Sequence, residues 1–372
     1  MELKFGLIGY GKMGQIRAKA ATAEGGEIVS VYDVHIPAEC PYEVADSIEA
    51  VIADPRSNII SVSLPNYLNK SVTIASLRAG KHVFCEKPPA FNAADVREIQ
   101  EAERLSGKTL MYGFNHRHHE AVLRAKELID SGSFGRILWM RGRYGKSVDG
   151  NYLKTWRTNK ELAGGGILLD QGIHMLDLFL FLSGQSFDKI SALVSNLYWN
   201  TPGIEDNVFA ILGNSETGLS ASLHSTMTQW RHLFSLEVFM EAGYFTVNGL
   251  KTSSGTYGDE VLTIARNRAT VPAADWDTEE RLQFPVDSSW AREAKVFLDA
   301  IRTGSLPTSG SSEQALTVME HIDRIYASDE RFVAPSLSSD LRAVLAIEPP
   351  PEDGAEIDPS AAWVAASQAA GG

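Results

Sequence analysis

The stretch Gly9-Tyr10-Gly11-Lys12-Met13-Gly14 follows an apolar run that begins at Leu3, and a helical pattern starts within it. In such a turn the first glycine permits a tight bend, the second lets the backbone approach a pyrophosphate, and the third lets helix and strand pack closely. The N–H groups of the helix N-terminus then face the phosphates. The motif predicts dinucleotide binding at the start of a Rossmann fold.

A carboxylate ends the next predicted strand. Asp33 stands nineteen residues after Gly14, where it can accept hydrogen bonds from the adenosine ribose hydroxyls. A 2′-phosphate would need a cation nearby, but the chain has no Lys or Arg between Lys19 and Arg56, and His35 is the only candidate. We therefore expect NAD as the cofactor, with NADP as the less favoured alternative.

Short apolar strands alternate with helical patterns through the first part of the chain, as in βαβ units around a parallel sheet. The predicted strands are Leu3–Ile8, Ile28–Tyr32, Ile59–Leu64, His82–Cys85 and Leu110–Phe114. The predicted helices are Met13–Ala23, Asn69–Ala79 and Ala93–Leu105. Asn69 and Asn92 are candidate N-caps, and Gly80 suits a helix C-cap.

The second part of the chain has consecutive strands joined by turns, which predicts a mainly antiparallel sheet and an α/β fold class overall. The predicted strands are Gly135–Tyr144, Ile190–Trp199, Asn207–Leu212, Gly218–Thr228, Phe234–Met240 and Gly243–Asn248. Further helices are predicted over His119–Asp130, Ser289–Arg302 and Ser312–Tyr326.

The length of 372 residues suggests two domains, which we place at residues 1–120 and 121–335. Residues 345–372 are acidic and rich in Pro and Ala, which predicts a flexible tail. The net charge of -13 argues against nucleic acid and anionic membranes as partners.

No run of residues approaches the ~20 apolar positions of a membrane helix. Cys40 and Cys85 are the only cysteines, which agrees with a reducing compartment and predicts a cytoplasmic protein. Cys85 lies in an apolar strand pattern, so we expect a buried structural thiol.

Two further segments carry chemistry. Glu86-Lys87-Pro88 follows a predicted strand at the carboxyl edge, where open α/β sheets bind ligands. Gly164-Gly165-Gly166 precedes a helix in which Asp170, His174 and Asp177 have the i, i+4, i+7 spacing of one face. Lys, His and Asp together offer a cation, a proton-exchanging group and a hydrogen-bond acceptor. The alternative is a solvated helix face with a structural histidine.

With Pro65-Asn66 and Gly113-Phe114-Asn115-His116-Arg117, these motifs resemble those of the Gfo/Idh/MocA oxidoreductases over roughly residues 3–330. The resemblance implies an N-terminal Rossmann domain and a C-terminal α/β domain whose open, mainly antiparallel sheet often serves as an oligomer interface. It therefore implies a homo-oligomer, a dimer or tetramer. Family members oxidise or reduce a ring carbon of sugars, cyclitols or nucleotide-linked sugars. A cis bond at Lys87-Pro88 is also implied.

By this resemblance Lys87 holds the substrate hydroxyl and helps to orient the nicotinamide, Asp170 binds a neighbouring hydroxyl, and His174 is the general base. The implied cofactor-binding residues are Gly9, Gly11, Lys12, Met13, Gly14, Asp33, Leu64, Pro65, Asn66, Glu86 and Lys87. The implied substrate-binding residues are Lys87, Asn115, Arg117, Tyr144, Trp156, Arg157, Asp170 and His174.

The chain departs from the family pattern at two positions. Asn69 stands where the family often has a histidine, and His118 replaces a usual aromatic residue. The cluster His116, His118 and His119 lacks accompanying cysteines or carboxylates, and the family chemistry needs no metal, so we expect no metal site.

Residues 136–160 are anomalously basic, with seven Lys or Arg against Asp149 alone. Arg141 and Arg143 alternate onto one strand face, and aromatic residues are interleaved. An aromatic surface can stack on a sugar while Arg holds a carboxylate or phosphate, which favours an anionic sugar over a neutral one. The alternative is a solvated strand or an oligomer contact. His224–Trp230, with Arg231-His232, could complete the same pocket, and a core strand explains the stretch nearly as well.

Together these features predict an NAD-dependent oxidoreductase that interconverts a secondary alcohol and a ketone on a sugar-like ring. Two alternatives stay open. In one, tightly bound NAD supports transient ring oxidation for glycoside cleavage, elimination or epimerisation. In the other, the chain is a noncatalytic NAD-binding regulator, which the presence of Lys87, Asp170 and His174 disfavours.

Overall fold

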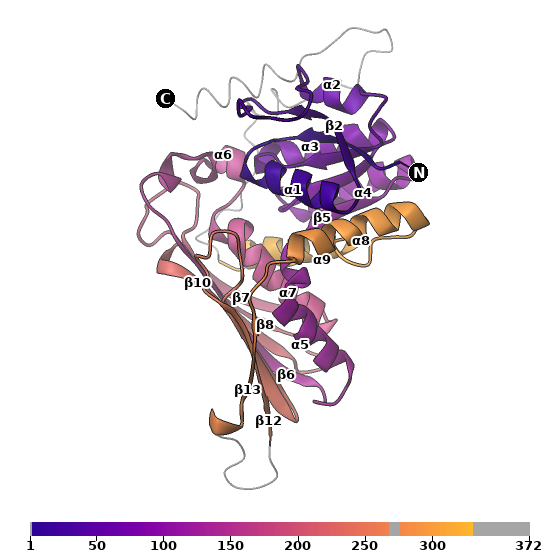
Figure 1. Ribbon diagram of the computed structural model, residues 1–372. Helices are drawn as coiled ribbons and strands as arrows, with labels where there is room; N and C mark the ends of the chain where they lie inside the picture. Colours follow the sequence, from indigo (N-terminus) through magenta and orange to yellow (C-terminus); the bar gives the residue numbers. More distant parts are fainter. Residues whose placement is uncertain (1, 268–275, 330–372) are drawn as a thin grey trace.

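The computed structural model describes residues 2–267 and 276–329, so the tail predicted at 345–372 lies outside the described residues. The described chain forms one five-stranded and one eight-stranded sheet. Figure 1 shows the smaller sheet and its helices above the larger sheet, whose long strands extend downward. The predicted α/β fold class is confirmed.

The first sheet is parallel throughout, with strand order β2-β1-β3-β4-β5. Its strands are β1 (Lys4–Ile8), β2 (Glu27–Tyr32), β3 (Ile59–Val62), β4 (His82–Glu86) and β5 (Leu110–Gly113). The crossover helices are α1 (Lys12–Ala23), α2 (Ile48–Ala53), α3 (Asn66–Arg78) and α4 (Ala93–Ser106). The chain leaves β1 toward β2 on one side and later adds β3 on the other, so a crevice opens beyond the carboxyl ends of β1 and β3.

The helix caps of this sheet are partly as predicted. The side chain of Asn92 accepts a hydrogen bond from the Asp95 N–H and caps α4. Asn69 does not cap a helix, because α3 already begins at Asn66, directly after Pro65. The amide of Asn69 instead donates to the Pro88 carbonyl at 2.8 Å. Asn69 therefore supports the turn that follows β4.

The second sheet has the order β13-β12-β11-β10-β6-β9-β8-β7. Only β6 and β9 run parallel, so the predicted mainly antiparallel sheet is confirmed. Its strands are β6 (Ile137–Ser147), β7 (Lys189–Ser195), β8 (Asn207–Gly213), β9 (Ser220–Thr226), β10 (Thr228–Met240), β11 (Gly243–Asn248), β12 (Glu260–Arg266) and β13 (Glu280–Phe284). Strands β12 and β13 extend the sheet beyond β11 and have no counterpart among the strands predicted from the sequence.

Helices α5 (Glu120–Asp130) and α9 (Ser312–Ala327) belong to the second part of the chain, and α9 also packs on α4. Helix α8 (Ser289–Thr303) packs on α1, and its Phe297 and Leu298 share an apolar cluster with Phe5 of β1. The chain thus returns to the first sheet after completing the second (Figure 1).

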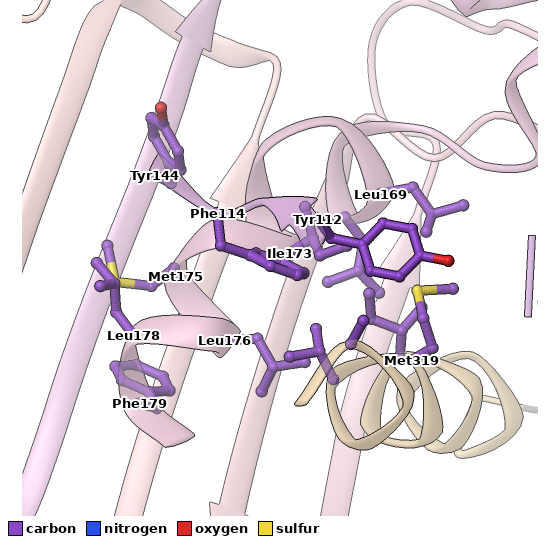
Figure 2. Packing of buried hydrophobic residues seen from close by; sticks show 14 of the residues in the cluster. Tyr112, Phe114, Tyr144, Leu169, Ile173, Met175, Leu176, Leu178, Phe179 and Met319 are labelled. Carbon is purple, nitrogen blue, oxygen red and sulfur yellow. The ribbon is translucent and has the colours of Figure 1, made fainter. Parts of the chain in front are cut away.

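Helix α7 (Ile173–Ser183) lies in the main core. Figure 2 shows its apolar side chains gathered with those of Tyr112 and Phe114 at the end of β5 and with Met319 of α9. By length and composition the stretch Lys160–Ser183 could cross a membrane, but most of it is buried inside the protein, as in the core helix of a globular protein.

The other face of the second sheet carries uncovered aromatic and aliphatic side chains. Phe209 and Ile211 of β8 are half-exposed or more, and the Trp139 ring of β6 stacks on Phe239 at 4.1 Å. The Phe209 ring stacks on His224 at 3.8 Å in the same cross-strand row. We call this surface the open face.

Candidate active site

A cavity of about 670 Å³ lies between the two sheets, beyond the carboxyl ends of β1, β3 and β4. Its walls come from the turns that follow these strands, from β6, from the segment 156–174 and from the loop 252–257. Ligands bind at this edge in open parallel sheets.

The glycine turn has the geometry of a phosphate cradle. A Cβ on Gly9 would lie 2.2 Å from the Ser63 carbonyl oxygen, and one on Gly14 would lie 2.0 Å from the Gly9 oxygen. A Cβ on Gly11 would meet nothing within 4 Å, because Gly11 faces the cavity together with Lys12 and Met13. Gly9 and Gly14 shape the turn, and Gly11 leaves room for a ligand at the start of α1.

Asp33 lines the cavity and is fixed by two backbone donors. Its carboxylate accepts hydrogen bonds from the Tyr10 N–H at 2.6 Å and the His35 N–H at 3.0 Å. The opposite wall holds Leu64, Pro65 and Asn66, which follow β3. These residues fit a nucleotide whose ribose lies against Asp33.

The turn after β4 presents Glu86 and Lys87 to the cavity. The Lys87-Pro88 bond is cis, as the family resemblance implies. Glu86 accepts a hydrogen bond from the Arg17 guanidinium at 2.6 Å, and Arg17 also reaches Glu293 of α8 at 2.5 Å. Burial raises the pKa of Glu293 to about 7.

Asp170 is the centre of a charge cluster in the cavity. Lys146 Nζ lies 2.7 Å from one carboxylate oxygen, and Lys87 Nζ and Arg157 Nε each lie 3.7 Å from the other. Lys87 also donates to the main-chain carbonyl of Asp170. Burial alone would raise the pKa of Asp170, but these cations outweigh it and hold the pKa well below its usual range. Burial lowers the pKa of Lys87, and Asp170 partly opposes that shift.

His174 stacks on His116 with ring centroids 3.8 Å apart. Burial, with further contributions from His116 and Lys87, holds the pKa of His174 well below its usual range, so the ring is neutral near pH 7. Its Nδ1 is buried and has no hydrogen-bond partner among the described residues. His174 is therefore an unprotonated base beside Lys87.

The partners of His116 fix its tautomer. Its Nδ1 lies 3.1 Å from the Asn115 side-chain oxygen and donates to it, so Nε2 accepts from the Tyr144 hydroxyl at 2.8 Å. Asn115, Tyr144 and Trp156, all expected to bind substrate, line the cavity as well.

Arg117, which was expected to bind substrate, does not line the cavity. It is buried and absent from the cavity lining, and its guanidinium is bound by Asp177 at 2.8 Å and by Gln314 at 2.6 Å. Asp177 likewise does not join Asp170 and His174 at the cavity. A π-helical turn, Leu168–Gly172, precedes α7 and breaks the regular i, i+4, i+7 spacing.

The basic segment 136–160 divides between two places. Arg141 and Arg143 lie on the open face, where Arg141 pairs with Glu237 at 2.7 Å, whereas Lys146 and Arg157 line the cavity. The expected pocket contribution of His224–Trp230 is wrong, because no residue of that stretch lines the cavity.

Several lining residues were missed by sequence reasoning: His116, Gln171, Thr252, Ser253, Ser254, Tyr257 and Trp290. Of these only His116 carried a signal, as part of a histidine cluster. Its neighbour His119 pairs with Glu260 at 2.7 Å. Within residues 2–267 and 276–329, no group of three or more His, Cys, Asp or Glu has a metal-binding arrangement.

Sequence models of one protein family match both parts of the chain. Residues 3–114 match the model described as "Oxidoreductase family, NAD-binding Rossmann fold", and residues 122–246 match the "GFO/IDH/MocA C-terminal domain". Together these segments span well over half of the chain.

Named relatives are enzymes of sugar chemistry. Levoglucosan dehydrogenase of Pseudarthrobacter phenanthrenivorans is 36% identical over 39% of this chain and 38% of its own length. 1,5-Anhydro-D-fructose reductase of Ensifer adhaerens is 28% identical over 78% of this chain and 85% of its own length. The chain thus matches well under half of the first relative and most of the second.

Solved structures share the fold. Levoglucosan dehydrogenase in complex with NADH and levoglucosan superposes with a TM-score of 0.76 at 23% identity, covering 90% of this chain and all of that one.

Proposed function

This chain belongs to the Gfo/Idh/MocA oxidoreductase family, and on that premise we propose that it interconverts a secondary alcohol and a ketone on a sugar-like ring, with NAD as coenzyme. The observation that carries the proposal is the convergence of Lys87, Asp170 and His174 on one cavity beside the glycine turn. The relatives named above act on sugar-like molecules, which supports the same substrate class.

The residues of the first sheet fit the coenzyme. Gly11, Lys12 and Met13 would hold the pyrophosphate, and Asp33 would accept hydrogen bonds from the adenosine ribose. The negative charge of Asp33 would repel a 2′-phosphate, which favours NAD over NADP. When bound, the nicotinamide supplies the hydride acceptor or donor. We call residues 9–14, Asp33 and 64–66 the coenzyme side of the cavity.

The substrate side of the cavity consists of Lys87, Asn115, His116, Tyr144, Lys146, Trp156, Arg157, Asp170 and His174. The Lys87 ammonium would donate to the reacting oxygen and stabilise negative charge as the hydroxyl proton leaves. Neutral His174 would take that proton, because its lowered pKa keeps the ring unprotonated at neutral pH. Asp170, held ionised by its cations, would accept a hydrogen bond from a neighbouring hydroxyl. Reduction of the ketone would use the same groups in reverse.

The same proposal includes the assembly and location of the chain. Residues 1–120 would bind coenzyme and 121–335 would bind substrate and carry the subunit contact, in a dimer or tetramer. The apolar open face supports that contact. The net charge of -13 disfavours nucleic acid and membrane partners, and two unpaired cysteines favour the cytoplasm.

The experiment is a substrate screen. The purified protein is mixed with NAD or NADP and with sugars, cyclitols, sugar acids and nucleotide sugars, and reduced coenzyme is followed by absorbance. We expect turnover with NAD and at least one compound that has a ring hydroxyl. Substrate conversion without NADH accumulation would favour the alternative in which NAD is retained, and faster turnover with NADP would overturn the coenzyme assignment.

A further inference from the structure

The substrate side of the cavity holds more positive than negative charge. Lys87, Lys146 and Arg157 surround the single carboxylate of Asp170. Glu86 also lines the cavity, but its charge is matched by buried Arg17. The second carboxylate on Arg17 belongs to Glu293, whose raised pKa leaves it partly protonated at neutral pH. Even with every carboxylate ionised, the four cations Arg17, Lys87, Lys146 and Arg157 outnumber the three carboxylates Asp170, Glu86 and Glu293, so this side of the described chain keeps unmatched positive charge.

The donors of Lys146 and Arg157 are not used up by Asp170. Lys146 has three N–H donors and gives one to Asp170 at 2.7 Å. Arg157 approaches Asp170 only at 3.7 Å, beyond hydrogen-bond distance, and its guanidinium lies 4.4 Å from the centre of the Trp156 ring. Their side chains are 17% and 36% exposed, and both line the cavity.

The task of keeping Asp170 ionised does not explain this surplus. Lys146 at 2.7 Å and the Lys87 ammonium already provide two cations for one carboxylate. A third like charge in a partly dehydrated cavity adds mutual repulsion, and charges in such places are normally paired. An incoming anion would remove that repulsion.

We propose that the substrate carries an oxyanion, a carboxylate or a phosphate, which Lys146 and Arg157 bind while the ring lies against Trp156. This inference rests on the proposed function and narrows its substrate class to acidic sugars. The planar guanidinium fork suits two oxygens of one oxyanion, and Lys146 adds a point charge. The centre of the Tyr152 ring lies 4.4 Å from Lys146 Nζ, and its hydroxyl donates to Asp170 at 3.3 Å, so Tyr152 supports Lys146 without lining the cavity.

The experiment compares D-glucuronate, D-glucose 6-phosphate and D-glucose as probes, by NADH formation and by calorimetric binding to the protein with NADH present. Wild-type protein should favour one of the two anionic probes over D-glucose by about tenfold to hundredfold in kcat/KM or in affinity. The carboxylate and phosphate arms identify which oxyanion the site accepts.

Two variants and one control locate the effect. Lys146→Gln and Arg157→Gln should each lower, by about tenfold, the ratio of kcat/KM or affinity for the anionic probe to that for D-glucose. Lys154→Gln, which changes an exposed lysine of the same basic segment, should leave the ratio unchanged. Retained NADH binding shows that each variant is folded.

The two proposals fail in different ways. Turnover of D-glucose as fast as that of both anions, or variants that slow all probes equally, would overturn the oxyanion site while the reaction stands. Binding of an anion that depends on Lys146 and Arg157, with no ring oxidation or reduction of any compound in the substrate screen, would overturn the reaction while the oxyanion site stands. If no probe shows Lys146-dependent binding or turnover, the oxyanion site is wrong.

Discussion

The coenzyme side and the substrate side of the cavity are built in opposite ways. On the coenzyme side, residues 9–14 are contiguous, and Asp33 is held by the backbone of the same turn at 2.6 Å. On the substrate side, Asp170 meets Lys87 and Lys146, which are 83 and 24 residues away in sequence. Backbone shape therefore governs the first side, and pairing of remote charged side chains governs the second.

The largest effect is expected from removing the reacting groups of the substrate side. Lys87→Ala and His174→Ala should each lower kcat by about 10²- to 10⁴-fold, because general acid-base groups contribute that much. NADH affinity should persist, since the coenzyme side is built separately. Steady-state kinetics and NADH fluorescence titration measure the two quantities. Turnover near that of the wild type in both variants would refute the assigned roles.

Arg117→Ala tests whether Arg117, which directly follows the cavity residues Asn115 and His116 in the chain, has a role in the cavity or only in stability. We expect the free energy of unfolding to fall by about 3–5 kcal/mol, because Asp177 would be left buried without its partner. Urea denaturation measures the loss. The double change Arg117→Met with Asp177→Leu removes both charges and should recover much of it. A raised KM with unchanged stability would instead place Arg117 at the substrate.

Gly11→Val should damage the coenzyme side without damaging the fold. A Cβ at Gly11 would meet nothing within 4 Å, and Gly11 lines the cavity, so a valine there should occupy coenzyme space and lower NADH affinity at least tenfold, or about 1.4 kcal/mol. Gly150→Val is the matched control, because Gly150 also has open space around it and lies outside the cavity lining. Equal NADH affinity in the two variants would contradict the cradle.

His116→Phe should give the smallest effect, a shift in pH dependence. The phenyl ring still stacks on His174. It cannot carry the positive charge by which His116 lowers the pKa of His174. The pKa of His174 should rise, so the acidic limb of the kcat/KM profile should move to higher pH by less than about one unit. A limb that moves to lower pH would show that His116 acts differently.

The coenzyme side could be predicted from sequence because its determinants are local. The glycine spacing and Asp33 identify a strand, a turn and a helix without knowledge of the rest of the fold. The same holds for the alternating helices and strands of the first sheet, all of which were placed except short α2.

The substrate side could be predicted only in part. Motif position and the family resemblance identified Lys87, Asp170 and His174 as site residues. Regular helical spacing could not reveal the π-helical turn that separates Asp170 from Asp177. Strand alternation puts Arg143 and Lys146 on opposite faces, but it could not show that the first face is open and that the second borders the cavity. Those outcomes depend on packing between segments that are remote in sequence.

Helix α8 gives the molecule a second covalent crossing between its halves. The polypeptide passes from the first sheet to the second after β5 and comes back through α8, whose Phe297 and Leu298 cover Phe5. A fragment that ends near residue 120 would leave these apolar partners bare, so the nucleotide-binding half is not a separable module. Helix α9 then packs on both α4 and β7, so any opening of the cavity must bend several chain connections together and cannot be a free swing on a single tether.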